Sequence, residues 1–263
     1  MLSIHKNEKL DELLSGKRVA LVGPAPHLTG KGIGKVIDEY DTVCRMNDII
    51  PMQHLREDYG SRTDILFHNF GTDFMCGLKQ KIEEHDGREH WEKLKLVVCP
   101  TIKSVGADVD YLSWPDDHVS DVVKNFESVN DCDLPFYWVG VRDYKTLWSI
   151  VGQEPNCGML AILLCHFYDV KELLITGFTF YKANGPKKLD VYCDGHWPSS
   201  VPDESDFRSG HGQDRQLSCF KNLCKSNDKI IVDEYMNQLL ELNHPKTLDI
   251  DFVSQSRSHK SRY

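Results

Sequence analysis

The chain has 263 residues, of which 40% are hydrophobic and 27% charged, and these fractions are typical of a globular protein. This length suits one large α/β domain or two small ones, and it allows a substantial buried core. The formal net charge of -9 arises from 31 basic and 40 acidic residues. Such an acidic balance argues against sequence-independent binding to nucleic acid, which needs clustered Lys and Arg to neutralise phosphates.

The cysteines are odd in number and contain no CxxC pair, so neither a disulfide framework nor a zinc ribbon fits their spacing. Free thiols in a reducing compartment are the simplest interpretation. The N-terminus carries no apolar signal core, and the longest apolar run, residues 159–168, is too short to span a membrane. The sequence therefore predicts a cytoplasmic protein with no transmembrane segment. The cysteines are Cys44, Cys76, Cys99, Cys132, Cys157, Cys165, Cys193, Cys219 and Cys224.

Short apolar runs alternate with amphipathic stretches, and this alternation predicts a parallel sheet covered by helices. We expect one domain over residues 1–253 and a flexible basic tail over residues 254–263. Residues 182–210 are rich in Pro, Gly, Ser and Asp, and a loop this long in a compact domain is typical of a functional segment. Strands are predicted over residues 18–23, 42–46, 64–68, 95–99, 136–139, 173–176 and 229–232. Helices are predicted over residues 7–15, 33–39, 73–84, 117–127, 143–150, 157–168, 211–225 and 233–242.

A Pro- and Gly-rich turn follows the first predicted strand, with Gly23 at its start and Gly30, Gly32 and Gly34 near its end. Glycines at this place let the backbone approach a ligand, and the next helix N-terminus offers N–H groups to a phosphate. The dinucleotide fingerprint is absent because Lys35 occupies the place of its third glycine, and no Walker motif occurs. A nucleotide site and a purely structural glycine turn therefore both stay open.

Two Asp-x-Asp sequences, at residues 108–110 and 249–251, match a pattern in which paired carboxylates hold a divalent cation on a nucleotide sugar. Solvated surface acids are the alternative, and the more frequent one in a chain with 40 acidic residues. The 12 histidines match no helical metal-binding spacing. Among them, His166 lies inside an apolar run and is interpreted as a core residue.

Two further residues are candidates for chemistry on their local sequence. His211 follows a Ser-Gly turn and opens a predicted helix, a place from which an imidazole can act as a general base. Cys157 begins the most apolar predicted helix, where the helix N-terminus could lower the thiol pKa. A capping role for His211 and a packing or ligand-contact role for Cys157 are the alternatives.

Read in order, these segments resemble the motifs of the sialyltransferase family, inverting glycosyltransferases that use CMP-activated sugars. Residues 18–47 and 58–69 resemble the family's long motif, residues 155–178 its short motif, and residues 209–232 its very short motif. His196 lies about where the third motif of the family falls. The positions that match the long motif are Gly32, Gly34, Ile37, Asp38, Asp41, Arg45, Asn47, Asp58, Gly60, Arg62 and Thr63.

This resemblance implies a single Rossmann-like α/β domain, with a parallel-rich sheet flanked by helices, in the GT-A-like variant of sialyltransferases. It implies a family-29-like glycosyltransferase that takes a CMP-sugar donor and a glycan acceptor and needs no cofactor or metal. The residues that it places at the donor are Gly23, Pro24, Ala25, Asn47, Asn156, Cys157, Gly158, Gly177 and Phe178.

The resemblance also implies a mechanism. His211 would take the proton from an acceptor hydroxyl that attacks from the face opposite the leaving group, which gives inversion. His196 would donate to the departing phosphate as charge develops there. The segment over residues 182–210 would close over donor and acceptor and exclude water.

The chain departs from the family pattern at several positions. The family disulfide is missing because Val19 and Tyr168 occupy its two places, as expected of a cytosolic viral- or bacterial-type relative. Residues 23–27 replace the family's G-N-S-G-N turn, so a side-chain amide contact to the nucleotide is lost and we expect backbone groups to substitute. Gln216 replaces the acidic residue of the very short motif. The transferred acidic sugar stays open: sialic acid, Kdo and related sugars all fit.

Two alternatives come from other readings of the same residues. A metal-dependent nucleotide-sugar transferase would use Asp108 and Asp110 as its cation ligands. A catalytically silent nucleotide-binding protein would explain why several donor positions are altered. The acceptor, the linkage and the oligomeric state are not set by any motif.

Overall fold

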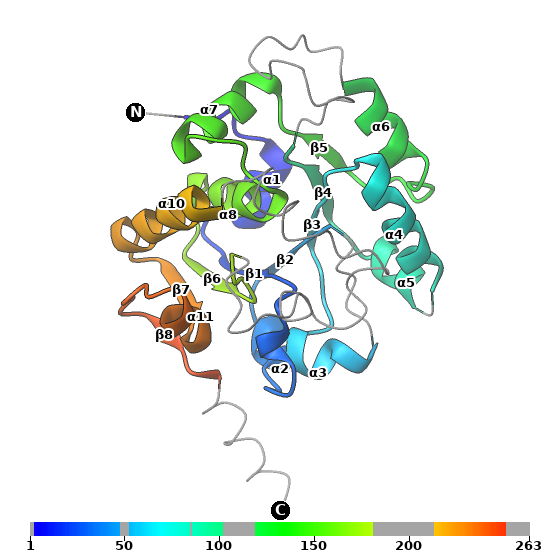
Figure 1. Ribbon diagram of the computed structural model, residues 1–263. Helices are drawn as coiled ribbons and strands as arrows, with labels where there is room; N and C mark the ends of the chain where they lie inside the picture. The colour runs from blue at the N-terminus through cyan, green and yellow to red at the C-terminus, as the bar shows by residue number, and fades with distance from the viewer. Residues whose placement is uncertain (1–2, 48–52, 85, 102–118, 181–212, 251–263) are drawn as a thin grey trace, which may run out of the picture.

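The computed structural model describes residues 3–47, 53–84, 86–101, 119–180 and 213–250. These residues form one sheet of eight strands in the order β5-β4-β3-β2-β1-β6-β7-β8, and every neighbouring pair is parallel (Figure 1). The predicted parallel α/β fold is therefore confirmed. The predicted loop over residues 182–210 and the predicted tail over residues 254–263 lie outside the described residues.

All seven predicted strands are present, with ends that shift by at most a residue or two. The short edge strand β8 was not predicted. The strands are β1 (Arg18–Val22), β2 (Thr42–Met46), β3 (Ile65–Phe67), β4 (Leu96–Cys99), β5 (Phe136–Trp138), β6 (Glu172–Thr176), β7 (Ile230–Asp233) and β8 (Thr247–Leu248).

The predicted helices are also present within the described residues, and two further short helices, α3 and α5, were not predicted. The helices are α1 (Glu8–Leu14), α2 (Gly34–Asp38), α3 (Arg56–Tyr59), α4 (Thr72–Glu83), α5 (Gly87–Glu92), α6 (Val119–Glu127), α7 (Val141–Val151), α8 (Cys157–Phe167), α10 (Gln213–Ser226) and α11 (Glu234–Leu239). Two 3-10 turns cover Pro26–Leu28 and Gln53–Leu55.

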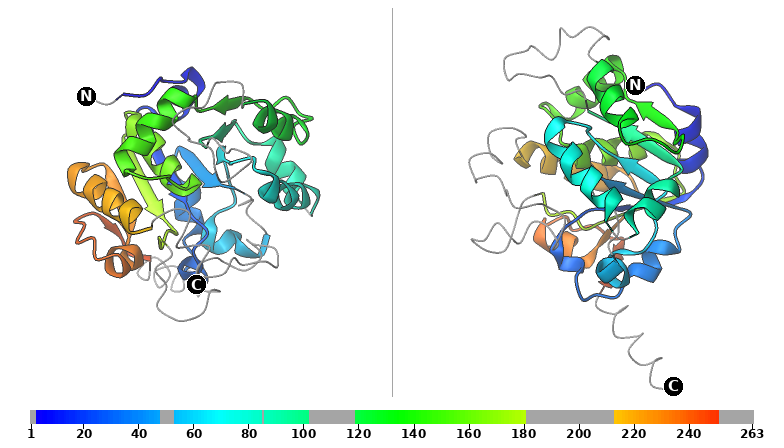
Figure 2. Two further views of the ribbon diagram at one scale, coloured as in Figure 1. Left: turned by 45° about the horizontal axis from the view of Figure 1, so that its top comes forward. Right: turned by 90° about the vertical axis from the view of Figure 1, so that its right-hand side faces the viewer.

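Helices cover both faces of the sheet, as the two views of Figure 2 show. On one face, α1, α7, α8 and α10 contribute side chains to the largest core cluster. On the other face, a second cluster forms between α4, α5, α6 and strands β3 and β4. A third cluster packs residues of α2 and α3 against β1, β2 and β6. The sheet is thus buried on both sides, as an all-parallel sheet requires.

Helix α8 is the most buried helix of the described chain. It begins at the N-cap Asn156, whose side chain accepts the backbone N–H of Met159 at 2.8 Å. Eight of its eleven residues are buried, including every residue over 159–165. A helix that is apolar all round has no solvent face, which explains why α8 lies against the centre of the sheet.

Strand β1 lies in the middle of the sheet, and the chain builds outward from it in both directions. Strands β2 to β5 follow on one side, and β6 to β8 follow on the other. The strand order therefore reverses between β1 and β6. In open parallel sheets, ligands bind in the crevice at the carboxyl ends of the strands at such a reversal.

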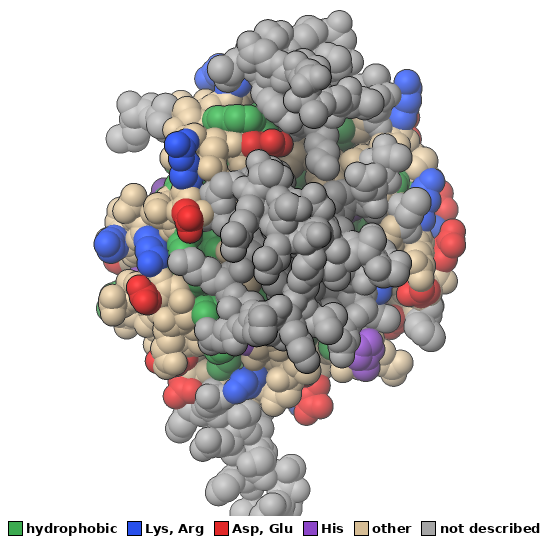
Figure 3. Space-filling view, viewed as in Figure 1, with side chains coloured by type: hydrophobic (Ala, Val, Ile, Leu, Met, Phe, Trp, Pro, Cys, Tyr) green, Lys and Arg blue, Asp and Glu red, His purple; other side chains and the backbone are tan. Residues whose placement is uncertain are grey.

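None of the helices in the described part of the chain is long and apolar enough to cross a bilayer. On the face shown in Figure 3, the acidic and basic side chains of described residues lie interspersed. The described Lys and Arg side chains on this face do not gather in one large cluster, as binding to a polyanion would need.

Candidate active site

Two glycines contact each other at the carboxyl ends of β1 and β6. A Cβ atom on Gly23 would lie 2.2 Å from the carbonyl oxygen of Gly177, and one on Gly177 would lie 2.4 Å from the carbonyl oxygen of Gly23. Gly177 also has a φ of 77°, which disfavours any L side chain. Only glycines fit at this contact, and it lies where the strand order reverses.

The N-terminus of α8 lies beside this contact. A Cβ on Gly158 would lie 3.1 Å from Cε1 of Phe178, which follows Gly177, and 3.5 Å from Sδ of Met46, at the end of β2. Because Asn156 caps Met159, the N–H groups of Cys157 and Gly158 are first-turn donors with no partner inside the helix. The structure thus brings close together Asn156, Gly158 and Phe178, three of the residues that the resemblance places at the donor.

Asn47 follows β2 and has a φ of 54°, a left-handed conformation that asparagine tolerates better than most residues. Its N–H donates to the carbonyl oxygen of Phe67 at 2.6 Å, which fixes the backbone at the sheet edge. The side-chain Oδ1 is buried and has no hydrogen-bond partner within the described residues. A buried amide oxygen left in this state is a group that a ligand donor would satisfy.

Cys157 is not arranged as a nucleophile. Its thiol is buried, donates to the carbonyl oxygen of Phe67 at 3.6 Å, and has a pKa raised by that burial. The packing alternative is therefore favoured over the prediction of an activated thiol. What Cys157 can offer to a ligand is its backbone N–H rather than its side chain.

The turn after β1 has no free backbone N–H over residues 23–26. The N–H of Gly23 donates to the carbonyl oxygen of Thr176 at 2.8 Å, and that of Ala25 donates to the carbonyl oxygen of Gly177 at 2.9 Å. The other two residues of this stretch are prolines, which have no N–H. The expectation that backbone donors here replace the lost side-chain amide is therefore wrong for these four residues.

The second set of glycines in the same connection has a structural role. The N–H groups of Gly30 and Gly32 both donate to the carboxylate of Asp58, each at 2.8 Å. A Cβ on Gly34 would lie 2.1 Å from the carbonyl oxygen of Arg56, so α2 and α3 pack too closely for any side chain there. The structural interpretation of these glycines, and not the phosphate interpretation, is supported.

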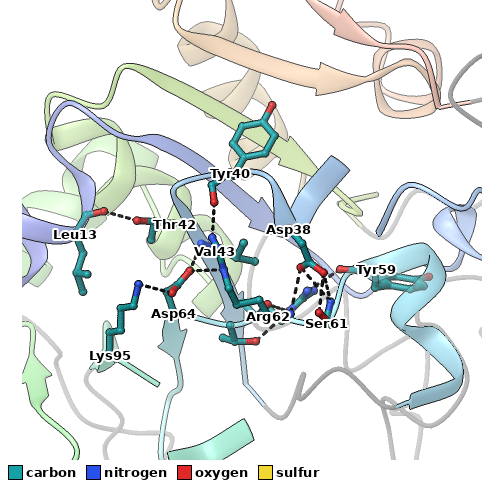
Figure 4. A network of polar contacts seen from close by, with 12 residues as sticks. Leu13, Asp38, Tyr40, Thr42, Val43, Tyr59, Ser61, Arg62, Asp64 and Lys95 are labelled. Atoms are coloured by element: carbon teal, nitrogen blue, oxygen red, sulfur yellow. Dashed lines mark hydrogen bonds and ion pairs between the residues drawn. The ribbon is translucent and has the colours of Figure 1, made fainter. Parts of the chain in front are cut away.

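The other polar residues of the long motif hold one another as well (Figure 4). Asp38 accepts the N–H and the hydroxyl of Ser61 and the N–H of Arg62, at 2.7 to 3.2 Å. Asp64 is buried, accepts the N–H of Val43 at 2.8 Å, and pairs with Arg62 at 3.0 Å and with Lys95 at 2.8 Å. These contacts fasten α2 and β2 to the segment that leads into β3.

Arg45 completes this network from inside the sheet. It is fully buried, and its guanidinium donates to the hydroxyl of Thr63 at 3.1 Å and to the carbonyl oxygen of Tyr59 at 2.6 Å. Most of the motif that carries the family resemblance therefore stabilises the fold. Asn47 differs from Asp38 and Asp64, because its buried side-chain oxygen has no hydrogen-bond partner among the described residues.

Sequence reasoning missed a cluster at the carboxyl end of β7. Asp233 is fully buried, and its Oδ2 lies 2.7 Å from Oγ1 of Thr176, 3.1 Å from Nε2 of His27 and 3.2 Å from the N–H of Gly177. Its Oδ1 accepts the N–H of Met236 at 2.7 Å and caps α11. Asp233 thus connects the turn after β1 with the ends of β6 and β7. No local pattern links positions so far apart.

His68, at the end of β3, is a second residue that the sequence did not single out. It is completely buried, and burial lowers its pKa to about 3. Its Nδ1 accepts the N–H of Phe70 at 2.9 Å, so the neutral ring carries its proton on Nε2. That Nε2 has no partner in the described part of the chain.

Several predicted residues cannot be placed. His196, His211, Asp108 and Asp110 lie outside the described residues, whereas Asp249 is exposed. No group of three or more potential metal ligands occurs among the described residues.

Two other predictions can be placed near α8. His166 is half-buried at the far end of that helix, where its Nδ1 lies 3.0 Å from Nδ2 of Asn227, and burial lowers its pKa. Gln216 of α10 accepts the N–H of Asn156 at 3.1 Å and is fully buried. Helix α10, which begins two residues after His211, therefore contacts the N-cap of α8 directly.

The N-terminal part of the chain matches a known family in sequence. Residues 3–105 match the model of glycosyltransferase family 29, the sialyltransferases. A search of curated proteins finds no matching sequence. The resemblance inferred from the motifs is confirmed over this segment.

Solved sialyltransferase structures share the fold over most of the chain. The monofunctional α-2,3-sialyltransferase Cst-I from Campylobacter jejuni is 14% identical with a TM-score of 0.57, covering 95% of this chain and 84% of its own. CstII from the same organism, in complex with a substrate analogue, cytidine-5'-monophosphate, is 12% identical with a TM-score of 0.52. This match covers 90% of this chain and 87% of CstII. A mammalian sialyltransferase in complex with a Gal-β-1-3GalNAc compound is 17% identical with a TM-score of 0.51. This match covers 88% of this chain and 75% of the mammalian chain. Because the sequence identities are below 20%, these similarities show a shared fold.

Proposed function

We propose that this chain, whose N-terminal part matches the sialyltransferases and whose fold is theirs, transfers an acidic sugar from a CMP donor to a glycan hydroxyl. The observation that carries the proposal is the Gly23–Gly177 contact at the reversal of strand order, with Asn47 and the α8 N-terminus beside it. Open parallel sheets bind ligands at such a reversal, and the first-turn donors and the unpartnered acceptor beside it suit a nucleotide.

Different described residues would contact different parts of the donor. The N–H groups of Cys157 and Gly158, at the positive end of an eleven-residue helix, suit oxygens of the ribose or the phosphate. The buried Oδ1 of Asn47 suits a donor such as a ribose hydroxyl or the amine of cytosine. Glycines at positions 23 and 177 allow the nucleotide to approach the backbone closely.

The chemical step is a single displacement at the anomeric carbon. The acceptor oxygen forms a bond to that carbon while the bond to the phosphate oxygen breaks, and the electron pair leaves with CMP. His211 takes the proton of the attacking hydroxyl, and His196 donates a hydrogen bond to the leaving phosphate. The contact between Gln216 and Asn156 supports this role for His211, because α10 begins two residues after it and reaches the donor side of α8.

A thermal-shift screen tests the donor class. We expect CMP and CMP-sugars to raise the melting temperature, and UMP, GDP and their conjugates to raise it much less. Stabilisation by uridine or guanosine nucleotides alone would remove the CMP assignment. Transfer measured with and without EDTA tests the metal-free mechanism, since loss of transfer on chelation would favour the Asp108–Asp110 alternative.

A His211→Ala variant tests the general base. We expect transfer to fall by about 100-fold or more while CMP affinity is kept, because the residue acts on the acceptor hydroxyl. Unchanged turnover would exclude His211 as the base. CMP binding without transfer to any acceptor in the unmodified protein would instead support a catalytically silent nucleotide-binding protein.

A further inference from the structure

The turn after β1 offers one polar side chain in place of its missing backbone donors. Over residues 23–26 each N–H is either bonded within the fold or absent. The next residue is His27, whose ring is almost completely buried, with a side-chain exposure of 5%. The first polar side chain that this turn can present to a ligand is therefore the imidazole of His27.

Two contacts fix the orientation of this imidazole. Nε2 lies 3.1 Å from Oδ2 of Asp233, and the ring stacks on Tyr235 with centroids 4.3 Å apart and planes inclined by 16°. The carboxylate has no proton to give when it is ionised, so Nε2 carries the hydrogen of this bond. A carboxylate that fixes one ring nitrogen leaves the other nitrogen oriented for a ligand.

The other nitrogen, Nδ1, is buried and has no hydrogen-bond partner within the described residues. A buried polar atom without a partner destabilises the folded protein, so each such atom calls for an explanation. Most of the polar groups around it are bonded: Asp233 accepts from Thr176, Gly177 and Met236 as well as from His27. An unpartnered atom inside a well-bonded cluster is one that a hydrogen bond from a bound molecule would satisfy.

The cluster also connects His27 to the donor site. Oδ2 of Asp233 is shared between His27 and the N–H of Gly177. Gly177 contacts Gly23 and is followed by Phe178, whose ring lies against Gly158 at the start of α8. One carboxylate thus separates His27 from the glycine contact where the nucleotide is proposed to bind.

We propose that His27 is a donor-binding residue whose Nδ1–H binds an anionic oxygen of the CMP moiety, and that Asp233 is its positioning residue. The inference rests on the proposed function, because the anion belongs to the nucleotide of that site. With Nε2–H bonded to Asp233, protonation of Nδ1 makes the ring a cation that gives a charge-assisted hydrogen bond to phosphate.

Binding of CMP and of cytidine, measured by calorimetry, tests this role because the two ligands differ in the phosphate alone. The variant is His27→Phe, which keeps a ring stacked on Tyr235 and removes both nitrogens. We expect it to bind CMP about 10- to 100-fold more weakly, the range for a hydrogen bond to a charged group. Its affinity for cytidine should stay within about twofold.

Two further variants separate a ligand role from a structural one. His27→Asn restores a neutral N–H donor and should recover part of the CMP affinity, which a loss of packing alone would not allow. Asp233→Asn keeps an oxygen that can cap α11 but loses the negative charge, and it should weaken CMP binding by about 3- to 10-fold with cytidine binding kept. His166→Phe, at the far end of α8, is the matched control and should leave both affinities unchanged.

Equal CMP affinity in the unmodified protein and in folded His27→Phe would overturn the inference while leaving the proposed function intact. Equal losses for CMP and cytidine would also overturn it, since they would mark a structural role. Failure of the unmodified protein to bind any cytidine nucleotide would overturn the proposed function, and this inference with it. If His27→Phe does not fold, the comparison of CMP with cytidine in His27→Asn decides the question, with an unchanged ratio overturning the inference.

Discussion

The connection between β1 and α2 contains two glycine-bearing regions that look alike in sequence and differ in structure. In the loop over residues 30–34, carboxylate oxygens of Asp58 accept the N–H groups of two glycines, and the third glycine packs against α3. In the turn over residues 23–27, the backbone donors are also used, but Nδ1 of His27 is left unpartnered among the described residues. The glycines of the first region are held by contacts within the fold, whereas the second region contains the buried nitrogen for which we propose a ligand.

This difference gives a criterion for separating fold from function in the long motif. Residues whose polar atoms are bonded within the fold, such as Asp38 and Asp58, stabilise the native state. Residues with a buried and unpartnered atom, such as Asn47 and His27, weaken it unless a ligand binds. Variants of the first kind should lower stability, and variants of the second kind should lower affinity.

Gly34→Ala should cause the largest loss of stability. Its new Cβ would lie 2.1 Å from the carbonyl oxygen of Arg56, so α2 and α3 must move apart. We expect a loss of at least about 3 kcal/mol in the free energy of unfolding, measured by urea denaturation. Gly30→Ala is the matched control: no atom of the described residues lies within 4 Å of its Cβ, and we expect its φ of 78° to cost about 1 kcal/mol of stability. Similar losses in the two variants would contradict the packing explanation.

Asp58→Ala should cause the second largest loss of stability. It removes the acceptor of two backbone N–H groups and should destabilise the protein by about 2 to 4 kcal/mol. At a temperature where the variant is folded, its CMP affinity should equal that of the unmodified protein. Selective loss of CMP binding, with stability unchanged, would show that this loop is a phosphate site after all.

The pH dependence of stability should depend on His68. Its folded pKa of about 3 lies below the ordinary value near 6.5, so between these pH values the unfolded chain binds the proton and the folded chain does not. Stability should therefore fall as the pH decreases through this window, by about 2 kcal/mol between pH 6.5 and pH 5 from this group. His68→Asn keeps an acceptor for the N–H of Phe70 and does not titrate. Denaturation curves at both pH values should show a smaller loss for the variant, and an equal loss would refute the assignment.

Asn47→Gly should have the smallest effect on the fold and a clear effect on binding. Glycine accepts the φ of 54° without strain, so the variant removes the unpartnered amide and little else. We expect CMP affinity to fall by about 10-fold, while the melting temperature stays the same or rises slightly. Asp133→Gly, at another left-handed and exposed position, should change neither quantity. A marked drop in melting temperature for Asn47→Gly would place Asn47 with the structural residues instead.

Much of the fold follows from the apolar pattern of the sequence. Strand β2 begins and ends at the predicted residues, because five consecutive buried side chains leave little ambiguity. Helix α5 was missed because two of its six residues are buried, Gly87 and Trp91, and they give no helical periodicity. Helix α3, with four residues, is too short to show a period.

The candidate site was predicted less completely, for a different physical reason. Sequence patterns place Asn47, Asn156 and Gly177 at the ends of elements, and the parallel sheet brings those ends to one edge. Patterns do not say whether a given N–H is already bonded, which is why the loop over residues 30–34 stayed ambiguous. The contact between His27 and Asp233 joins positions 206 residues apart, and a motif search has no means to pair them.

The central place of β1 also bears on how the chain is made. One edge of β1 can pair with β2 soon after both have left the ribosome, but the other edge pairs with β6, which begins at Glu172. About 150 residues must be synthesised in between, which takes about 8 to 30 s at usual translation rates. During this interval β1 keeps an open, apolar edge of the kind that pairs with other chains. Newly made chains should therefore depend on protection of this edge until β6 arrives, and the same event completes the Gly23–Gly177 contact.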